Sequence, residues 1–339
     1  MKIAQIGFVA FAMMIWTGDA ITVTPQESNA YFAANGLDSN PCTRAAPCLT
    51  LDKASAMSYP PGSIINFRGG DTFTGCWFLD PTNVPTGGIS SNPIIIQSYG
   101  TGRASWIANC PGRFQALFVS SQVSGVIIQN LKLSSGGTQT AVGIGIEGPG
   151  DTIIAQDIEV SGFNYNLNGN WGGEIFVASF GSFRRRGCNA LNNVQVINSQ
   201  LHGEQGATSP DAFGISGNGC DGNISNAVYK GNTVYNIGSY TNAPATASGN
   251  GIVANSVSVG EVSYNLIHDI GGNTNTCGGP TGIMTWHADR IVVQFNEVYN
   301  VAPVVDQGGC DFVGIDFDGG TTNSIAQYIT RTTMLARRG

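Results

Sequence analysis

The chain has 339 residues and a mass of 35.4 kDa; 11% of its residues are charged, 42% are hydrophobic and 47 are glycine. Many glycines and few charge pairs exclude a protein built on long surface helices, and the hydrophobic content excludes a disordered chain. The net charge of −7 and the pI near 4.8 argue against a surface for nucleic acid or anionic membranes. The composition therefore favours an all-β protein with many turns.

The first twenty residues predict an export signal. A basic start, Met1-Lys2, precedes an apolar run from Ile3 to Trp16, and small residues lead up to Ala20. The run is too short to cross a hydrocarbon core of about 30 Å, and no later segment is long and apolar enough to do so. We therefore expect a signal peptide over residues 1–20, and a secreted or periplasmic protein without a membrane span.

Residues 21–62 predict an N-terminal cap region that contains one short helix. Thr50 is a suitable N-cap residue, and Leu51, Ala54 and Met57 fall on one face of the helix that would follow it. An amphipathic helix at this point would close the open end of the domain that begins after it, where unpaired strand groups would otherwise meet solvent.

Residues 63–328 contain a repeat of about 33 residues, within the range of repeat architectures. A short apolar motif, often with Asn two places before its end, finishes at Leu133, Val160, Leu201, Val234, Ile267 and Val298. A Gly-Ile motif precedes most copies, as at Gly251-Ile252 and Gly282-Ile283. Two or three short strands per period, with alternating polarity and no helical pattern, predict the coils of a parallel β-solenoid. Leucine-rich repeats and propeller blades fit neither the period nor the motifs.

The cysteine spacing supports stacked coils. All eight cysteines follow Ala20, and an even number in an exported chain favours disulfides over zinc sites. Equivalent residues on stacked coils lie about 4.8 Å apart, within the Cα–Cα range of a disulfide, about 4.4–6.8 Å. The expected bridges are one loop staple, Cys42–Cys48, and three links between neighbouring coils, Cys76–Cys110, Cys188–Cys220 and Cys277–Cys310.

Several stretches resemble secreted right-handed parallel β-helix proteins of the pectate-lyase-like, polysaccharide-degrading group. The resemblance lies in Tyr31 to Pro41, Ala46-Pro47, Leu49 to Ala54, Pro61 to Gly70, Pro93 to Gly100 and Gly314 to Gly320. It covers nearly all of the chain after the signal peptide. It implies a right-handed parallel β-helix but not one chemistry, because lyases, hydrolases and non-catalytic proteins share this scaffold.

Aligning the Gly-Ile strands sorts their residues by face. The inward positions are Ile144, Ile215, Ile252, Ile283 and Ile315, followed by Ile146, Ala254, Thr285 and Phe317. The outward column contains Glu147, Asn218, Asn255, Trp286 and Asp318. We predict that Trp286, Asn255 and Asn218 bind substrate, because amides pair with sugar hydroxyls and an outward Trp offers an aromatic platform. The alternative is that the asparagines only end strands and begin turns.

Acidic residues are densest near the end of the repeats. Asp311, Asp316 and Asp318 lie within eight residues, and His287 and Arg290 lie about one coil earlier. We take these five residues as the catalytic candidates. Neighbouring carboxylates supply an acid and a base for glycoside hydrolysis. Alternatively, the three aspartates bind Ca²⁺, and the resemblance to β-helix lyases implies Arg290 or Lys230 as the base that abstracts a proton in an elimination. A solvated, turn-rich strand end is the competing interpretation.

Two further charged features carry less weight. His202, His268 and His287 have no metal-ligand spacing, so we expect no zinc site. The run Arg184-Arg185-Arg186 has the composition of a clamp for an acidic polymer, although such runs are more often solvated loops.

These observations lead to one expected function and one alternative. We expect a monomeric polysaccharide lyase or glycoside hydrolase with a polysaccharide substrate, and Ca²⁺ as its one candidate cofactor. The alternative is a non-catalytic cell-surface or adhesion β-helix that binds polysaccharide. The sequence leaves elimination, hydrolysis and binding open.

Residues 329–339 predict a frame error in the coding sequence. They contain Arg331, Arg337 and Arg338, although only two basic residues occur between Gly187 and Tyr328. Arg331 falls one period after Val298, at a position that is aliphatic in earlier copies and where an unpaired Arg would be costly to bury. Inserting one nucleotide after the codon of Tyr328 restores the Tyr-Asn-x-x-His-Asp pattern that starts at Tyr264. The alternative is a genuine polar tail.

Overall fold

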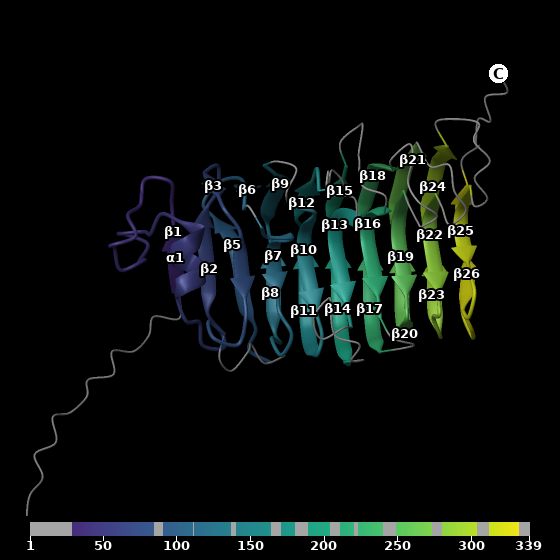
Figure 1. Cartoon of the computed structure of the whole chain (residues 1–339), viewed down its shortest axis with the longest axis horizontal. Helices are drawn as coiled ribbons and strands as arrows, with labels where there is room; N and C mark the ends of the chain where they lie inside the picture. The colour runs from purple at the N-terminus through teal and green to yellow at the C-terminus, as the bar shows by residue number, and fades with distance from the viewer. Residues whose placement is uncertain are drawn as a thin grey trace, which may run out of the picture.

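The computed structural model describes residues 29–84, 91–110, 112–136, 140–163, 171–179, 189–203, 211–219, 223–239, 249–272, 280–303 and 312–331. Over these residues the chain forms three sheets of parallel strands and one short helix (Figure 1). The chain visits the three sheets in turn, so each strand pairs with the equivalent strand one coil later. The predicted parallel solenoid is confirmed.

We name the sheets A, B and C, and one coil runs through them in this order. Sheet A contains β1 (Asn29–Phe32), β2 (Ile64–Arg68), β5 (Ile94–Tyr99), β8 (Val126–Gln129), β11 (Gly150–Gln156), β14 (Leu191–Ile197), β17 (Ile224–Lys230), β20 (Val257–Ser263), β23 (Ile291–Gln294) and β26 (Ile325–Gln327). Sheet B contains β3 (Thr72–Thr74), β6 (Ala104–Ala108), β9 (Leu131–Ser135), β12 (Glu159–Ser161), β15 (Gln200–His202), β18 (Thr233–Ser239), β21 (Leu266–Gly272), β24 (Glu297–Pro303) and β27 (Thr330–Arg331). Sheet C contains β4 (Trp77–Leu79), β7 (Gln115–Val119), β10 (Val142–Glu147), β13 (Trp171–Ala178), β16 (Asp211–Asn218), β19 (Asn250–Asn255), β22 (Thr281–Trp286) and β25 (Val313–Phe317).

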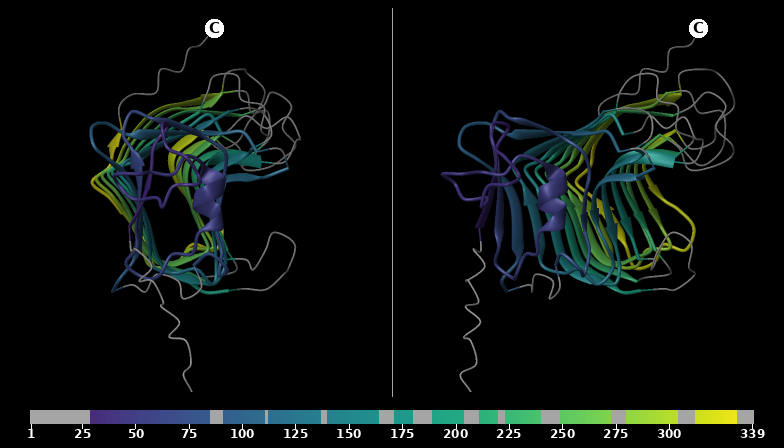
Figure 2. Two further views of the ribbon diagram at one scale, coloured as in Figure 1. Left: turned by 90° about the vertical axis from the view of Figure 1, so that its left-hand side faces the viewer. Right: turned by 60° about the vertical axis from the view of Figure 1, so that its left-hand side comes forward.

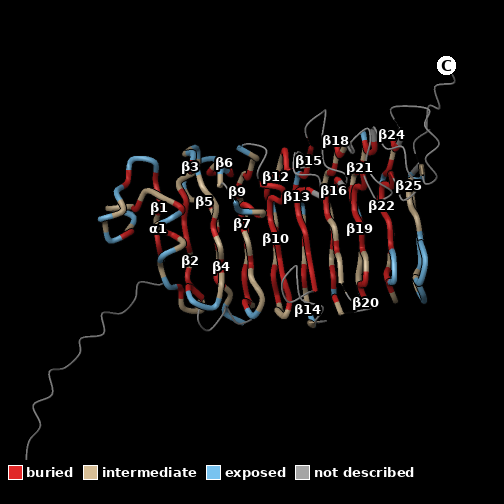
Figure 3. Tube along the Cα trace, viewed as in Figure 1, coloured by how far each residue is buried: buried red, intermediate tan, exposed pale blue. Residues whose placement is uncertain are grey.

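The core is a stack of apolar side chains between the three sheets. The predicted inward residues Ile144, Ile215, Ile252 and Ile283 are completely buried, because each coil covers the one before it (Figure 3). Phe317 differs from the expectation: it is 38% exposed, since β25 pairs only with β22 among the described strands.

The Gly-Ile motif has a steric cause. A Cβ atom on Gly282 would lie 2.4 Å from a methyl group of Val298, and one on Gly251 would lie 2.7 Å from a methyl group of Ile267. Sheet C therefore begins so close to sheet B that the position before the buried isoleucine accepts little more than a hydrogen atom.

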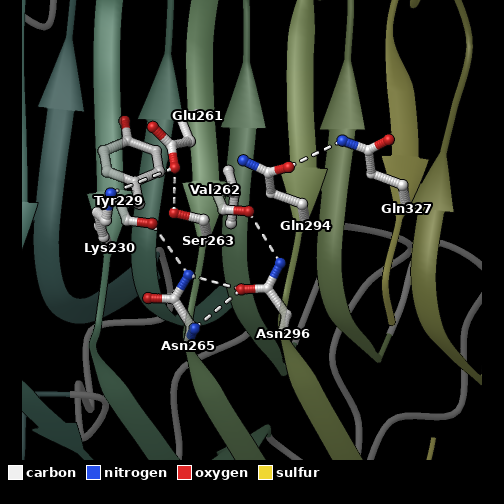
Figure 4. Close-up of polar contacts among 9 residues, drawn as sticks. All are labelled: Tyr229, Lys230, Glu261, Val262, Ser263, Asn265, Gln294, Asn296 and Gln327. Carbon is white, nitrogen blue, oxygen red and sulfur yellow. Dashed lines mark hydrogen bonds and ion pairs between the residues drawn. The ribbon is translucent and has the colours of Figure 1, made fainter. Parts of the chain in front are cut away.

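A buried asparagine ladder explains the Asn in the other repeat motif. The amide of Asn265 donates to the carbonyl oxygen of Tyr229 at 2.9 Å and to Oδ1 of Asn296 at 2.9 Å (Figure 4). Asn232 makes the equivalent bond to Oδ1 of Asn265. These amides satisfy backbone groups where the chain turns from sheet A into sheet B, which fixes the corner. In the next coil the ladder position is Ile329.

The predicted helix and two of the predicted disulfides are present at the N-terminal end. Helix α1 (Leu51–Ala56) begins after Thr50, whose hydroxyl accepts from the Lys53 amide at 3.0 Å, and it buries Leu51 and Ala54. The helix lies at this end of the solenoid (Figure 2), but six residues span only about 9 Å and do not form a complete cap.

One bridge is the predicted loop staple, and the other agrees with the predicted coil register. The Cα atoms are 4.7 Å apart in Cys42–Cys48 and 6.1 Å apart in Cys76–Cys110. The pairs Cys188–Cys220 and Cys277–Cys310 lie outside the described residues and stay predictions.

The structure describes only part of each end of the chain. The predicted signal peptide belongs to residues 1–28, which are not described, and no helix in the described part is long and apolar enough to cross a membrane. The backbone of Arg331 pairs in register with Val298, as the period predicts. Residues 332–339 lie outside the described part, so the frame error stays a prediction.

Candidate functional site

The predicted outward column exists on sheet C, at the edge where the chain turns toward sheet A. Asn255 is in register with Trp286, and its amide nitrogen lies 3.5 Å from Oδ1 of Asn218. Trp286 is 42% exposed, whereas the two asparagines are partly buried. Ala178 lies between Glu147 and Asn218 in this column, and Glu147 is buried. The part of the column that solvent reaches therefore runs from Asn218 through Asn255 to Trp286.

Trp286 lies beside an unusual histidine. The Trp286 and His287 rings are 5.3 Å apart and perpendicular, and His287 has a left-handed backbone with φ of 49°. The His287 amide donates to the Gly319 carbonyl oxygen at 3.0 Å, and a Cβ atom on Gly320 would lie 3.1 Å from the imidazole. This bond and this packing hold a non-glycine residue in a conformation that is costly without support.

The structure places two of the three predicted aspartates at the end of sheet C. Asp316 is partly buried in β25, in register with Met284, while Asp318 follows the strand and is exposed. Two residues along a strand separate Cα atoms by about 6.5–7 Å. The Asp318 carboxylate accepts from the Gly319 amide at 2.6 Å, so it belongs to the same turn that supports His287. Asp311 lies outside the described residues.

Arg290 contacts a second group of residues, where the chain enters strand β23 of sheet A. Its guanidinium lies 3.2 Å from the Asp289 carboxylate and donates to the Ser258 carbonyl oxygen at 3.4 Å. Hydrogen bonds from Asn323 and then from Thr322 hold the pKa of Asp289 below its usual value. The described contacts of Arg290 are thus an ion pair and a carbonyl group, and its role as a base stays a prediction.

Lys230 does not belong to the acidic group. It ends β17 in sheet A, with its Nζ atom 3.5 Å from Glu261, whereas Asp316 lies in sheet C. The structure therefore separates Lys230 from the aspartates that an elimination would pair with it.

The other histidines form a row on sheet B. His202, Tyr235, His268 and Tyr299 stack in successive coils, with ring centroids 4.7, 5.3 and 4.9 Å apart. Burial would raise the pKa of Asp269, but hydrogen bonds from His268 and Asn300 outweigh it and hold that pKa below its usual value. No group of three metal-ligating side chains occurs within the described ranges. His268 therefore stacks between two tyrosine rings and bonds to the carboxylate of Asp269.

Sequence reasoning missed two features of the site. Ser256 has a left-handed backbone, and its hydroxyl contacts Oδ1 of Asn255 and the Gly219 carbonyl oxygen, both at 2.8 Å, which orients Asn255. Strand β13 was also missed, because its coil is 41 residues long and its motif reads Gly-Glu-Ile. Glu174 in this strand is completely buried, where the neighbouring coils have glycine. A glutamate at the position where the neighbouring coils have glycine was the feature of the sequence that could have revealed this residue.

Comparisons with known proteins address the fold. The structure is similar to a GH136 lacto-N-biosidase from Eubacterium ramulus, with a TM-score of 0.64 and 16% sequence identity over 89% of this chain and 56% of the other. It is also similar to pectate lyase Pel9A, with a TM-score of 0.50 and 13% identity over 89% of this chain and 79% of that one.

The fold is a right-handed parallel β-helix. The chain spans 56% of the length of the lacto-N-biosidase. No protein-family model matches the sequence, and a comparison with curated proteins finds no match.

Proposed function

We propose that this protein is secreted and cleaves a polysaccharide on the outer face of sheet C. The observation that carries the proposal is Trp286, an exposed indole in register with Asn255 and flanked by the left-handed His287. An aromatic surface next to fixed amide groups suits a pyranose ring, which has apolar C–H faces and hydroxyl edges. The resemblance in sequence and the two structural neighbours named above are consistent with this class of substrate.

In the proposed cleavage, Asp316 and Asp318 act on the scissile bond beside Trp286. Their Cα atoms lie about 6.5–7 Å apart, and side chains on that spacing can place their carboxyl groups at the separation of about 6.5–9.5 Å found in inverting glycosidases. Asp316 is the more buried of the two, so it is assigned as the acid, while the exposed Asp318 is assigned as the base. His287 borders this position and contributes a third polar group.

Elimination is the second chemical possibility for the same residues. Carboxylate oxygens are the donors that Ca²⁺ prefers, and Asp316, Asp318 and Asp311 would hold the ion. When bound, Ca²⁺ would neutralise the carboxylate of an acidic sugar. The described contacts of Arg290 and Lys230 with acidic partners favour hydrolysis over this route, because each carries a carboxylate beside it.

A non-catalytic adhesion protein is the remaining candidate. The observation in its favour is the pair of hydrogen bonds that tie Asn255 to Asn218 and Ser256. Amide groups fixed in this way can bind the hydroxyl groups of a sugar, but they do not transfer protons. In that case Trp286 and the asparagines bind glycan, and the aspartates are solvated residues of a turn.

One experiment separates these functions. The mature protein is incubated with a panel of neutral and acidic polysaccharides, with and without Ca²⁺, and the products are assayed for reducing ends and for ultraviolet absorbance. Reducing ends alone indicate hydrolysis, absorbance from an unsaturated product indicates elimination, and binding without products indicates adhesion. Asp316→Asn and Asp318→Asn are each expected to lower hydrolysis at least 100-fold. Unchanged rates in both variants would refute the acidic site.

A further inference from the structure

The corner between sheets A and B carries a second surface feature, which the proposed site does not use. In every coil from β8 onward, one residue at this corner has a left-handed backbone with φ between 50° and 68°. In four coils it is a residue type that tolerates this conformation: Asn130, Asp157, Asn198 and Gly231. In the last three it is Tyr264, Phe295 and Tyr328. A bulky residue in this conformation is a genuine outlier.

These three aromatic residues form a continuous exposed strip, which we call the aromatic strip. Their side chains are 53%, 41% and 67% exposed. The ring centroids are 4.9 and 4.8 Å apart, and the planes differ by 17° and 2°. Carbon atoms in contact lie about 3.5–4.0 Å apart, so nearly parallel rings at this centroid spacing are offset from one another. Each ring therefore leaves part of a face uncovered.

A row of hydrogen-bonding groups runs directly beside the aromatic strip. Gln294 and Gln327 precede Phe295 and Tyr328, and their amides are joined at 2.8 Å (Figure 4). Lys230 ends the row, 3.5 Å from Glu261 and 5.3 Å from the centroid of the Tyr264 ring. The charge of this lysine is balanced within the protein, so the strip combines aromatic faces with amides and no net charge.

The corner is also rigid. The residues that follow Tyr264 and Phe295 are Asn265 and Asn296, which belong to the buried amide ladder. The backbone under the first two rings is thus held in place before a ligand arrives, which lowers the entropic cost of binding.

The size and shape of the strip select its ligand. An aromatic side chain has about 150–250 Å² of surface, so at these exposures the three rings offer roughly 300 Å². A stable contact with a second copy or another protein needs about 800 Å² per partner. A narrow linear polymer needs less contact area, and the apolar faces and hydroxyl edges of its sugar rings match a row of aromatic faces next to amides.

We propose that the aromatic strip binds a neutral polysaccharide chain along the solenoid axis, at a site separate from sheet C. This inference rests on the proposed function for its class of ligand.

The test replaces the three rings with asparagine, which two of the earlier coils have at the same corner. The variant Tyr264→Asn/Phe295→Asn/Tyr328→Asn keeps the left-handed turns, and circular dichroism checks that it folds. Binding to soluble xylan, β-glucan, galactan and polygalacturonate is measured by affinity electrophoresis. We expect at least tenfold weaker binding of a neutral polymer and an unchanged rate on short oligosaccharides. Leu37→Asn, which removes a 59% exposed side chain elsewhere, is the matched control and should bind as the unaltered protein does.

The outcomes separate this inference from the proposed function. If Trp286→Ala abolishes polymer binding while the Asn variant retains it, the aromatic strip is not a binding site and the sheet C site stands. If no polymer is cleaved but the Asn variant loses binding, the strip is supported and the cleavage is refuted.

Three further results overturn the inference: no polymer binds the unaltered protein, only polygalacturonate binding depends on the strip, or sedimentation shows that the strip mediates self-association. Should the Asn variant fail to fold, Gln294→Ala/Gln327→Ala removes the amide row alone, and unchanged binding in this variant would equally refute the proposal.

Discussion

The first coils and the last coils of this solenoid use aromatic residues in opposite ways. Near the N-terminal end, Phe67, Trp77 and Trp106 pack against one another in the core, with centroids 4.8–6.2 Å apart, and all three are buried. In the last coils the core is aliphatic, and Trp286 and Phe295 are among the aromatic residues on the surface. Buried rings stabilise a fold, whereas exposed rings cost solvation and suggest a ligand. We therefore expect the aromatic core to stabilise the N-terminal end, and the proposed binding surfaces to lie in the last coils.

The largest effect predicted from this comparison is at Trp77. Trp77→Ala should lower the free energy of unfolding by about 3–5 kcal/mol, because it removes a completely buried ring and leaves a cavity among Phe67 and Trp106. Chemical denaturation measures this loss. Trp286→Ala is the matched control and should change stability by less than about 1 kcal/mol. Equal losses in the two variants would contradict the division between the two ends.

The next largest effect concerns the disulfide that links the first coils. Replacing Cys76 and Cys110 together with serine should cost about 2–4 kcal/mol, since the bridge closes a loop across one coil. Thermal unfolding of the double variant, compared with the unaltered protein under oxidising conditions, gives the value. A loss seen only when reductant is added to both proteins would show that another bridge carries the stability.

A smaller effect is expected in the asparagine ladder of the last coils. Asn265→Ala removes the amide that satisfies the Tyr229 carbonyl group and should cost about 1–3 kcal/mol. Asn35→Ala changes the same side chain at an exposed position in the N-terminal region and should have little effect. If both variants unfold at the same denaturant concentration, the ladder does not hold the corner in the way that the aromatic strip requires.

The smallest predicted effect depends on pH. Burial would raise the pKa of Glu159, but its bonds to Lys132 and then to His202 outweigh this and hold the pKa below the ordinary value of 4.5. Its contribution is therefore complete above pH 4.5 and is lost as the pH falls through the lowered pKa. Glu159→Gln should cost at most about 1 kcal/mol at neutral pH, because the pair is partly solvated, and nothing in strong acid. If the stability lost in Glu159→Gln increased as the pH fell, the predicted pH dependence would be wrong.

Much of the candidate site was predictable, because alternation along a strand is local. The outward positions of Asn255 and Trp286 follow from the inward position of Ile283 and its equivalents, since side chains on a strand point to opposite faces in turn. The support given by Ser256 and by Gly319 was not predictable. Those contacts join turns of neighbouring coils, and the lengths of the turns vary too much for the sequence to align them.

The sequence by itself determined the solenoid, its register and the residues of its core. A period of about 33 residues places equivalent residues of stacked coils side by side, so the same local pattern is repeated in every contact. Only the tertiary structure decided which surface residues lie together. Tyr264, Phe295 and Tyr328 are 31 and 33 residues apart and look like unrelated exposed positions until the coils bring their rings to 4.9 and 4.8 Å. The physical reason is that burial is selected coil by coil, whereas a binding surface exists only across coils.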